Sequence, residues 1–160
     1  MRIHGVISED FVNYKKPSLF IGTCFCDWKC CKEQNLDVGV CQNAPHAKSS
    51  ILDFPNELLF DLFAANDITE AVVIGGLEPM LQIAEVLQLI EFFREWGEMC
   101  PFVIYTGYYP HEIESQLESL KRFKNIIVKY GRYIPDDDER YDEVLGVILA
   151  SSNQYAEVLS

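Results

Sequence analysis

The sequence predicts an α/β fold, with one domain over residues 1 to 160 in which a parallel sheet forms an open, partial (βα) barrel. Short apolar runs alternate along the chain with stretches of helical periodicity, and strands that alternate with helices normally pair in parallel. A complete eight-stranded α/β barrel needs about 200 residues or more. A chain of 160 residues can therefore supply only part of such a barrel.

Four apolar runs are predicted to be strands. The run Ala71 to Ile74 is mostly β-branched and stops at paired glycines, which is typical of a buried strand. The run Ser18 to Thr23 ends at a cysteine-rich loop, so that loop is expected at the carboxyl end of a strand. The other three predicted strands are Ser18 to Thr23, Phe102 to Tyr105 and Ile126 to Tyr130.

Three segments between these strands have the apolar spacing of amphipathic helices. Pro55 to Ala65 follows Asp53, a candidate N-cap, and Leu81 to Trp96 has a wide apolar stripe. Pro110 to Leu120 is the third predicted helix. The acidic stretch Asp136 to Glu139 is predicted to be a solvated turn.

The charge balance argues against nucleic-acid binding. The chain has 25 Asp and Glu against 13 Lys and Arg, a formal net charge of -12, whereas nucleic-acid-binding proteins normally present a basic surface. No apolar run approaches the length that spans a membrane, and the N-terminus lacks the pattern of a secretory signal. We therefore expect a cytoplasmic protein that binds neither nucleic acid nor membrane.

Six cysteines are present, and four of them fall within the eight positions from Cys24 to Cys31. In the cytoplasm such clustering favours metal ligands over disulfides. The loop over residues 24 to 45 is the predicted metal site, and Cys26, Cys30 and Cys41 are candidate ligands. Because a closed iron-sulfur cluster uses four thiolates, a three-cysteine set leaves one iron open to an outside ligand.

Two of the cysteines remain alternatives as ligands. Cys24 and Cys31 lie beside the candidate set, and either one replaces an assigned ligand if the loop folds differently. Cys24 and Cys100 are otherwise expected to be packed, buried thiols. The three histidines are isolated in the sequence, so none of them is expected to bind metal.

The cysteine spacing is similar to the Cys-x3-Cys-x2-Cys signature of a known superfamily. The pair Cys26 and Cys30 keeps the first gap, and Cys41-Gln42-Asn43 is similar to the Cys-Tyr-Asn that carries the third ligand there. The second gap differs, because ten residues separate Cys30 from Cys41. A longer loop can still close on a cluster, since the entropic cost of closing a loop grows slowly with its length.

Four further segments match the same family in the same order along the chain. Each short match is weak alone, and their order gives them weight. They are Gly75-Gly76-Leu77-Glu78-Pro79 (with Leu77 as an extra residue), Tyr105-Thr106-Gly107-Tyr108, Gly131-Arg132-Tyr133-Ile134 and Ser151-Ser152-Asn153-Gln154. From about Pro17 onward, the chain therefore resembles the radical S-adenosylmethionine (SAM) superfamily and, within it, the activating proteins of anaerobic ribonucleotide reductase.

The resemblance implies two cofactors. A 4Fe-4S cluster would be held by Cys26, Cys30 and Cys41, and SAM would bind its open iron through amino and carboxylate groups. No catalytic residue is expected beyond the cluster ligands. The residues expected to bind SAM, and the role of each, are Glu78 (methionine ammonium), Gly75 and Gly76 (close backbone approach), Thr106 (ribose or carboxylate) and Lys129 (carboxylate, or else a solvated strand residue).

The resemblance also implies an activity. One electron from the cluster would cleave SAM to a 5'-deoxyadenosyl radical, which would abstract hydrogen from a glycine of the large anaerobic ribonucleotide reductase subunit. A reduced flavodoxin or a ferredoxin-type protein would supply the electron. Two alternatives stay open: a radical SAM enzyme acting on another glycyl radical enzyme or another substrate, and a zinc-binding structural or partner-binding module that uses four cysteines.

Overall fold

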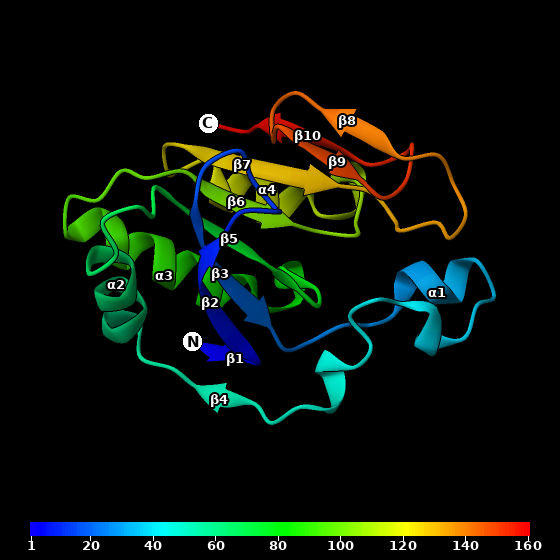
Figure 1. The fold of residues 1–160 in the computed structure, drawn as a ribbon, viewed down its shortest axis with the longest axis horizontal. Coiled ribbons are helices and arrows are strands. Elements are labelled where there is room, and N and C mark those ends of the chain that lie inside the picture. The colour runs from blue at the N-terminus through cyan, green and yellow to red at the C-terminus, as the bar shows by residue number, and fades with distance from the viewer.

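A computed structural model describes all residues from 1 to 160 and has an α/β fold built on one large sheet (Figure 1). The strands are β1 (Arg2–Ile3), β2 (Gly5–Asp10), β3 (Ser18–Thr23), β4 (Leu52–Asp53), β5 (Ala71–Gly76), β6 (Phe102–Tyr105), β7 (Ile126–Tyr130), β8 (Arg140–Asp142), β9 (Val147–Leu149) and β10 (Tyr155–Val158). The α-helices are α1 (Lys29–Glu33), α2 (Asn56–Ala64), α3 (Ile83–Glu95) and α4 (Glu114–Leu120). The 3-10 helices are η1 (Val38–Val40), η2 (His46–Lys48), η3 (Pro79–Gln82) and η4 (Pro110–Glu112).

The large sheet has six strands in the order β10-β7-β6-β5-β3-β2. Its four central strands are parallel, as the alternation of strands and helices predicted. The two edge strands, β2 and β10, pair antiparallel with their neighbours, which the sequence analysis did not predict. The parallel arrangement brings the carboxyl ends of β3, β5, β6 and β7 to one edge of the sheet.

Most predicted boundaries agree with the structure. The strands β3, β6 and β7 have the predicted limits, and β5 continues two residues further, to Gly76. The predicted helix over residues 81 to 96 begins as η3, where Pro79 takes the first position and the Glu78 carboxylate accepts from the Met80 amide. The predicted helix over residues 110 to 120 is divided into η4 and α4 at Ile113, whose φ of -135° is not helical.

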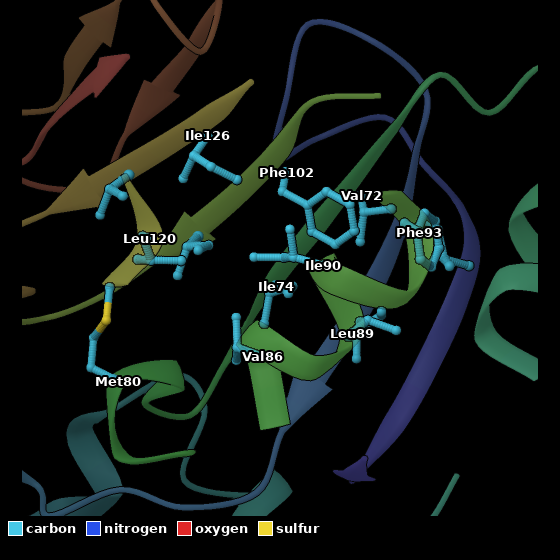
Figure 2. Close-up of a cluster of buried hydrophobic side chains, with 14 of the residues drawn as sticks. Val72, Ile74, Met80, Val86, Leu89, Ile90, Phe93, Phe102, Leu120 and Ile126 are labelled. Carbon is cyan, nitrogen blue, oxygen red and sulfur yellow. The ribbon is translucent and has the colours of Figure 1, made fainter. Parts of the chain in front are cut away.

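The sheet is buried on both faces. Along β5, successive side chains point to opposite faces, so Val72 and Ile74 join one core while Ala71 and Val73 join the other. The larger core lies under α2, α3 and α4, and Figure 2 shows it around Ile90 and Phe102. Packed pairs of aromatic rings extend this core toward the helices. The side chains labelled in Figure 2 are Val72, Ile74, Met80, Val86, Leu89, Ile90, Phe93, Phe102, Leu120 and Ile126.

The second face of the sheet is covered by a different part of the chain. Leu145 and Leu149, from the β8–β9 hairpin, pack against Val73 and Val103 of the sheet, together with Tyr14 from the loop after β2. The Lys15 amide donates to the Leu145 carbonyl at 2.7 Å and so ties that loop to the hairpin. None of the helices combines the length and the hydropathy needed to cross a membrane.

Candidate functional site

A cavity of about 540 Å³ opens at the carboxyl ends of the parallel strands. Figure 1 shows α1 at this end of the molecule, beyond the arrowheads of β3 and β7. The volume falls within the range of about 300 to 1,000 Å³ that is usual for small-molecule sites. Every site residue predicted from the sequence lines this cavity: Cys26, Cys30, Cys41, Gly75, Gly76, Glu78, Thr106 and Lys129.

The first part of the cysteine loop, residues 24 to 34, is bonded to the ends of the sheet strands. The Glu78 amide donates to the Phe25 carbonyl at 2.7 Å, and the Tyr108 hydroxyl donates to Asp27 at 2.8 Å. Trp28 takes a left-handed conformation with φ of 61°, and its amide donates to the Cys26 sulfur at 3.3 Å. These contacts fix the chain on both sides of Cys26 before α1 begins.

Cys30 lies in α1 against the turn that follows β6. A Cβ built on Gly107 would lie 3.6 Å from Glu78 Oε2, an ordinary contact, but only 2.9 Å from the Cys30 sulfur, which is too close. Glycine at this position therefore allows the thiol and the carboxylate to approach the same peptide. The Gly107 amide donates to Glu78 Oε2 at 2.9 Å.

Cys41, the third predicted ligand, lies in a more exposed part of the chain. Cys41 follows η1 and is half-buried, and of residues 35 to 50 only Ala44 is buried. Cys31 is buried and lines the same cavity, so it remains an alternative to an assigned ligand. Cys24 is buried, lies outside the cavity lining and donates from its thiol to Gln82 at 3.4 Å. Cys24 and Cys100 are both buried, as predicted.

The predicted cysteine ligands share a cavity without forming a compact metal site. No group of three or more His, Cys, Asp or Glu side chains is arranged to hold a metal ion. Burial raises the pKa of Cys26 to about 12 and also raises the pKa of Cys30, so metal binding must release protons.

Glu78 is 6% exposed, and three protein donors hold its carboxylate. Oε1 accepts from the Met80 amide at 3.0 Å and from the Thr106 hydroxyl at 2.7 Å, and Oε2 accepts from the Gly107 amide. Burial raises the pKa of Glu78 to about 6, although these donors act against the rise. Since a carboxylate offers about four acceptor sites, one remains on Oε2 for a ligand.

Thr106 is also committed to the protein. Its hydroxyl donates to Glu78 and accepts from the Tyr108 amide at 3.0 Å. The hydroxyl proton is therefore used, and only one acceptor lone pair is left for a ligand.

Lys129 lies at the end of β7, inside the cavity, and is 6% exposed. Its ammonium donates one hydrogen bond to the protein, to the Gly131 carbonyl at 3.2 Å, and lies 5.7 Å from the centre of the Tyr105 ring. Burial lowers the pKa of Lys129 to about 8. Because Lys129 is buried, the alternative of a solvated strand residue is wrong. Two N–H donors of its ammonium have no protein partner and are available in the cavity.

Gly76 is required by the backbone. Its φ of 84° lies in the region that favours glycine, and a Cβ there would lie 3.2 Å from the Cα of Gly22. The glycine at the end of β5 therefore allows the neighbouring strand β3 to approach. Gly75, immediately before it, lines the cavity.

Two other matched segments bind each other. The Ser151 hydroxyl donates to the Ile134 carbonyl at 3.1 Å and accepts from the Ile134 amide at 2.8 Å. The Asn153 side-chain amide donates to the Arg132 carbonyl at 3.0 Å. Residues 151 to 154 therefore hold residues 131 to 134 in place beside the site. The Ser152 amide and hydroxyl also donate to Asp137, so the predicted solvated turn has one anchored member.

No role was predicted for Arg132, although it lies in the matched segment Gly131-Arg132-Tyr133-Ile134. The side chain of Arg132 binds Glu33 of α1 at 2.9 Å and Glu112 of η4 at 2.6 Å. Glu112 has a lowered pKa, chiefly because of its hydrogen bonds from Arg132. An arginine inside a matched segment was the available signal, but its partners are far away in the sequence.

A scan of protein-family models and searches of curated proteins and solved structures each found no match for this chain. The residues of the cavity therefore carry what is known of the function of this chain.

Proposed function

We propose that this chain is an iron-sulfur radical SAM enzyme that generates a glycyl radical on anaerobic ribonucleotide reductase. The single observation that carries the proposal is that one cavity is lined by four cysteines of the loop, among them the three proposed ligands, and by Glu78, Thr106 and Lys129 from three strand ends. These residues are separated in sequence by up to 103 positions, from Cys26 to Lys129. A purely structural metal module has no need for the buried ammonium or the buried carboxylate beside the thiols.

The cluster ligands in this proposal are Cys26, Cys30 and Cys41. When bound, a 4Fe-4S cluster supplies the single electron that cleaves SAM to methionine and a 5'-deoxyadenosyl radical. The protein contributes the position of the thiols and a cavity wall that limits access of water. Burial of Cys26 and Cys30 serves this purpose, since both are only partly exposed.

The polar residues of the cavity suit the amino-acid part of SAM. The free acceptor site on Glu78 would take a hydrogen from the methionine ammonium. The two unused donors of Lys129 would bind the methionine carboxylate, and the charge on both partners strengthens that bond. Thr106 would act mainly by orienting Glu78, through the bond of 2.7 Å between them.

The sheet is consistent with an open, partial barrel around this site. Its edge strands β2 and β10 do not pair with one another, so one side of the sheet is not closed by hydrogen bonds. An open side would admit a loop of a large protein, and the glycine of a reductase subunit is such a substrate. Reduced flavodoxin or a ferredoxin-type protein would be the electron donor, and another glycyl radical enzyme is the alternative target.

Anaerobic reconstitution with iron and sulfide tests the proposal. We expect about four irons per chain and visible absorption that is lost in air. The reduced protein should show an EPR signal that changes when SAM is added. With the reductase subunit present, 5'-deoxyadenosine should form together with a glycyl radical doublet on the partner.

Three results would contradict parts of the proposal. Stoichiometric zinc without iron uptake would end the enzyme assignment and favour the zinc module. Iron uptake without an EPR response to SAM would contradict the proposal that SAM binds at the cluster. Rapid formation of 5'-deoxyadenosine with a small molecule, and no modified protein partner, would keep the radical chemistry and reject the activating role.

A further inference from the structure

The guanidinium of Arg132 is 5% exposed, and all five of its N–H donors are used. Nε and Nη2 donate to the two oxygens of Glu33, each at 2.9 Å. Nη1 and Nη2 donate to the two oxygens of Glu112, at 2.6 and 2.7 Å. Nη1 also donates to the Gly107 carbonyl, at 2.7 Å. A buried guanidinium with every donor satisfied holds its partners in a single geometry.

These partners belong to the two walls of the candidate site. Glu33 is the last residue of α1, the short helix that carries Cys30. The bonds from Arg132 to Glu33 therefore also restrain the position of Cys30. Gly107 contacts the Cys30 sulfur on one side, and its amide donates to Glu78 on the other. Arg132 therefore bonds both to the helix that carries the thiol and to the peptide against which the thiol lies.

Charge balance explains why the network tolerates burial. Lys29, also in α1, forms an ion pair with Glu112, so two cations face two carboxylates. Lysine could not replace Arg132, because an ammonium has three donors and cannot bind two carboxylates in a planar, bidentate manner.

We infer that Arg132 is a positioning residue that sets the distance between the cysteine helix and the turn holding Glu78. In the proposed enzyme, this distance fixes where the cluster lies relative to SAM, so the inference rests on the proposed function for its ligands. The juxtaposition of α1 and the turn after β6 is a property of the metal-free protein and can be measured there.

The main experiment compares Arg132→Lys with the wild type and with the matched control Arg122→Lys. Arg122 is exposed and lies outside the site. We expect Arg132→Lys to take up iron as the wild type does but to bind SAM about tenfold more weakly, because small displacements of bound groups are costly. The change in the EPR signal on adding SAM should be reduced in Arg132→Lys and normal in Arg122→Lys. Wild-type affinity together with a wild-type EPR response in Arg132→Lys would overturn the inference.

A second variant covers the case in which Arg132→Lys does not fold. Glu33→Gln weakens the link between Arg132 and α1, because the amide offers one acceptor oxygen and no charge in place of the two carboxylate oxygens that Arg132 binds. The Glu33 side chain is 46% exposed, and the change spares the bonds of Arg132 to Glu112 and Gly107. Weaker SAM binding with normal iron content is expected again. Unchanged SAM binding in Glu33→Gln would overturn the inference.

Alkylation of the metal-free protein separates this inference from the proposed function. Cys30 should react with iodoacetamide several times faster in Arg132→Lys than in the wild type, while buried Cys100 should react at the same rate in both. If the wild type takes up no iron, the proposed function fails, but a faster reaction at Cys30 still supports the role of Arg132. Equal rates at Cys30 in both proteins would overturn that role.

Discussion

The chain between β3 and β4 has an inner half (residues 24 to 34) and an outer half (residues 35 to 50), which are held in different ways. Residues 24 to 34 bond to the ends of β5, β6 and β7 through partners such as Glu78, Tyr108 and Arg132. Residues 35 to 50 bond mainly to one another over short sequence distances, apart from contacts of Ser49 and Ser50 with His4. The sheet therefore positions Cys26 and Cys30, whereas Cys41 depends on local turns. A bound cluster would supply the long-range contact that the outer half lacks.

The largest effect should follow from removing a sulfur from either half. Cys26→Ala, Cys30→Ala and Cys41→Ala are each expected to abolish iron uptake in anaerobic reconstitution, because a cluster held by two thiolates is not retained. Iron content and visible absorption are the measurements. Cys100→Ala is the control and should bind iron normally.

A different result would change the comparison. Full iron uptake in Cys41→Ala with loss in Cys31→Ala would move the third ligand into the inner half, since Cys31 lines the same cavity.

Amide hydrogen exchange should separate the two halves directly. Iron binding is expected to slow exchange over residues 35 to 50 by more than about tenfold, because ligation couples binding to local folding. The amides of residues 25 to 34 should change less, since the strand ends already hold them. Equal slowing in both halves, measured by mass spectrometry, would show that the inner half is not preformed.

The cavity wall facing the inner half should respond to pH. The pKa of Lys129 is about 8, so its ammonium is mostly charged at pH 7 and mostly neutral at pH 9. SAM affinity should therefore fall about tenfold over this range as the charged fraction falls. Calorimetric titration is the measurement. Lys129→Met should bind weakly at both pH values, and a similar pH dependence in that variant would assign the titration to another group.

The smallest predicted effect concerns a single anchor of the inner half. Tyr108→Phe removes the hydroxyl that donates to Asp27 at 2.8 Å. The free energy of unfolding should fall by about 1 kcal/mol, the usual net value of one hydrogen bond. Urea denaturation of the metal-free protein measures it. Tyr141→Phe is the matched control, because Tyr141 is 62% exposed, and a loss of the same size there would remove the special role of the anchor.

The sequence was most informative where apolar patterns were strong. The strands β3, β6 and β7 were predicted with the observed limits because each is a mostly apolar run. The hairpin β8–β9 was missed because its strands are short and partly exposed, as Ile148 at 65% exposure illustrates. The edge strand β10 was missed for a similar reason, since Glu157 and Val158 both face solvent.

The candidate site divides in the same way. Residues at the ends of apolar strands, such as Glu78 and Lys129, could be placed near one another because parallel strands end at a common edge. The pairing of Arg132 with Glu33 spans 99 positions and leaves no periodic signal in the sequence. The commitment of the Glu78 carboxylate to three protein donors was also hidden, because two of the donors are backbone amides that every residue type except proline carries.

Position 107 has a consequence for variation of this chain. The space that a methyl group would need there belongs to the sulfur of Cys30. If every amino acid is tried at position 107, alanine should be compatible with folding only when α1 moves outward. Such a variant should keep its melting temperature but lose iron uptake. A screen for folded protein would then accept alanine at this position, whereas a screen for iron binding would reject it.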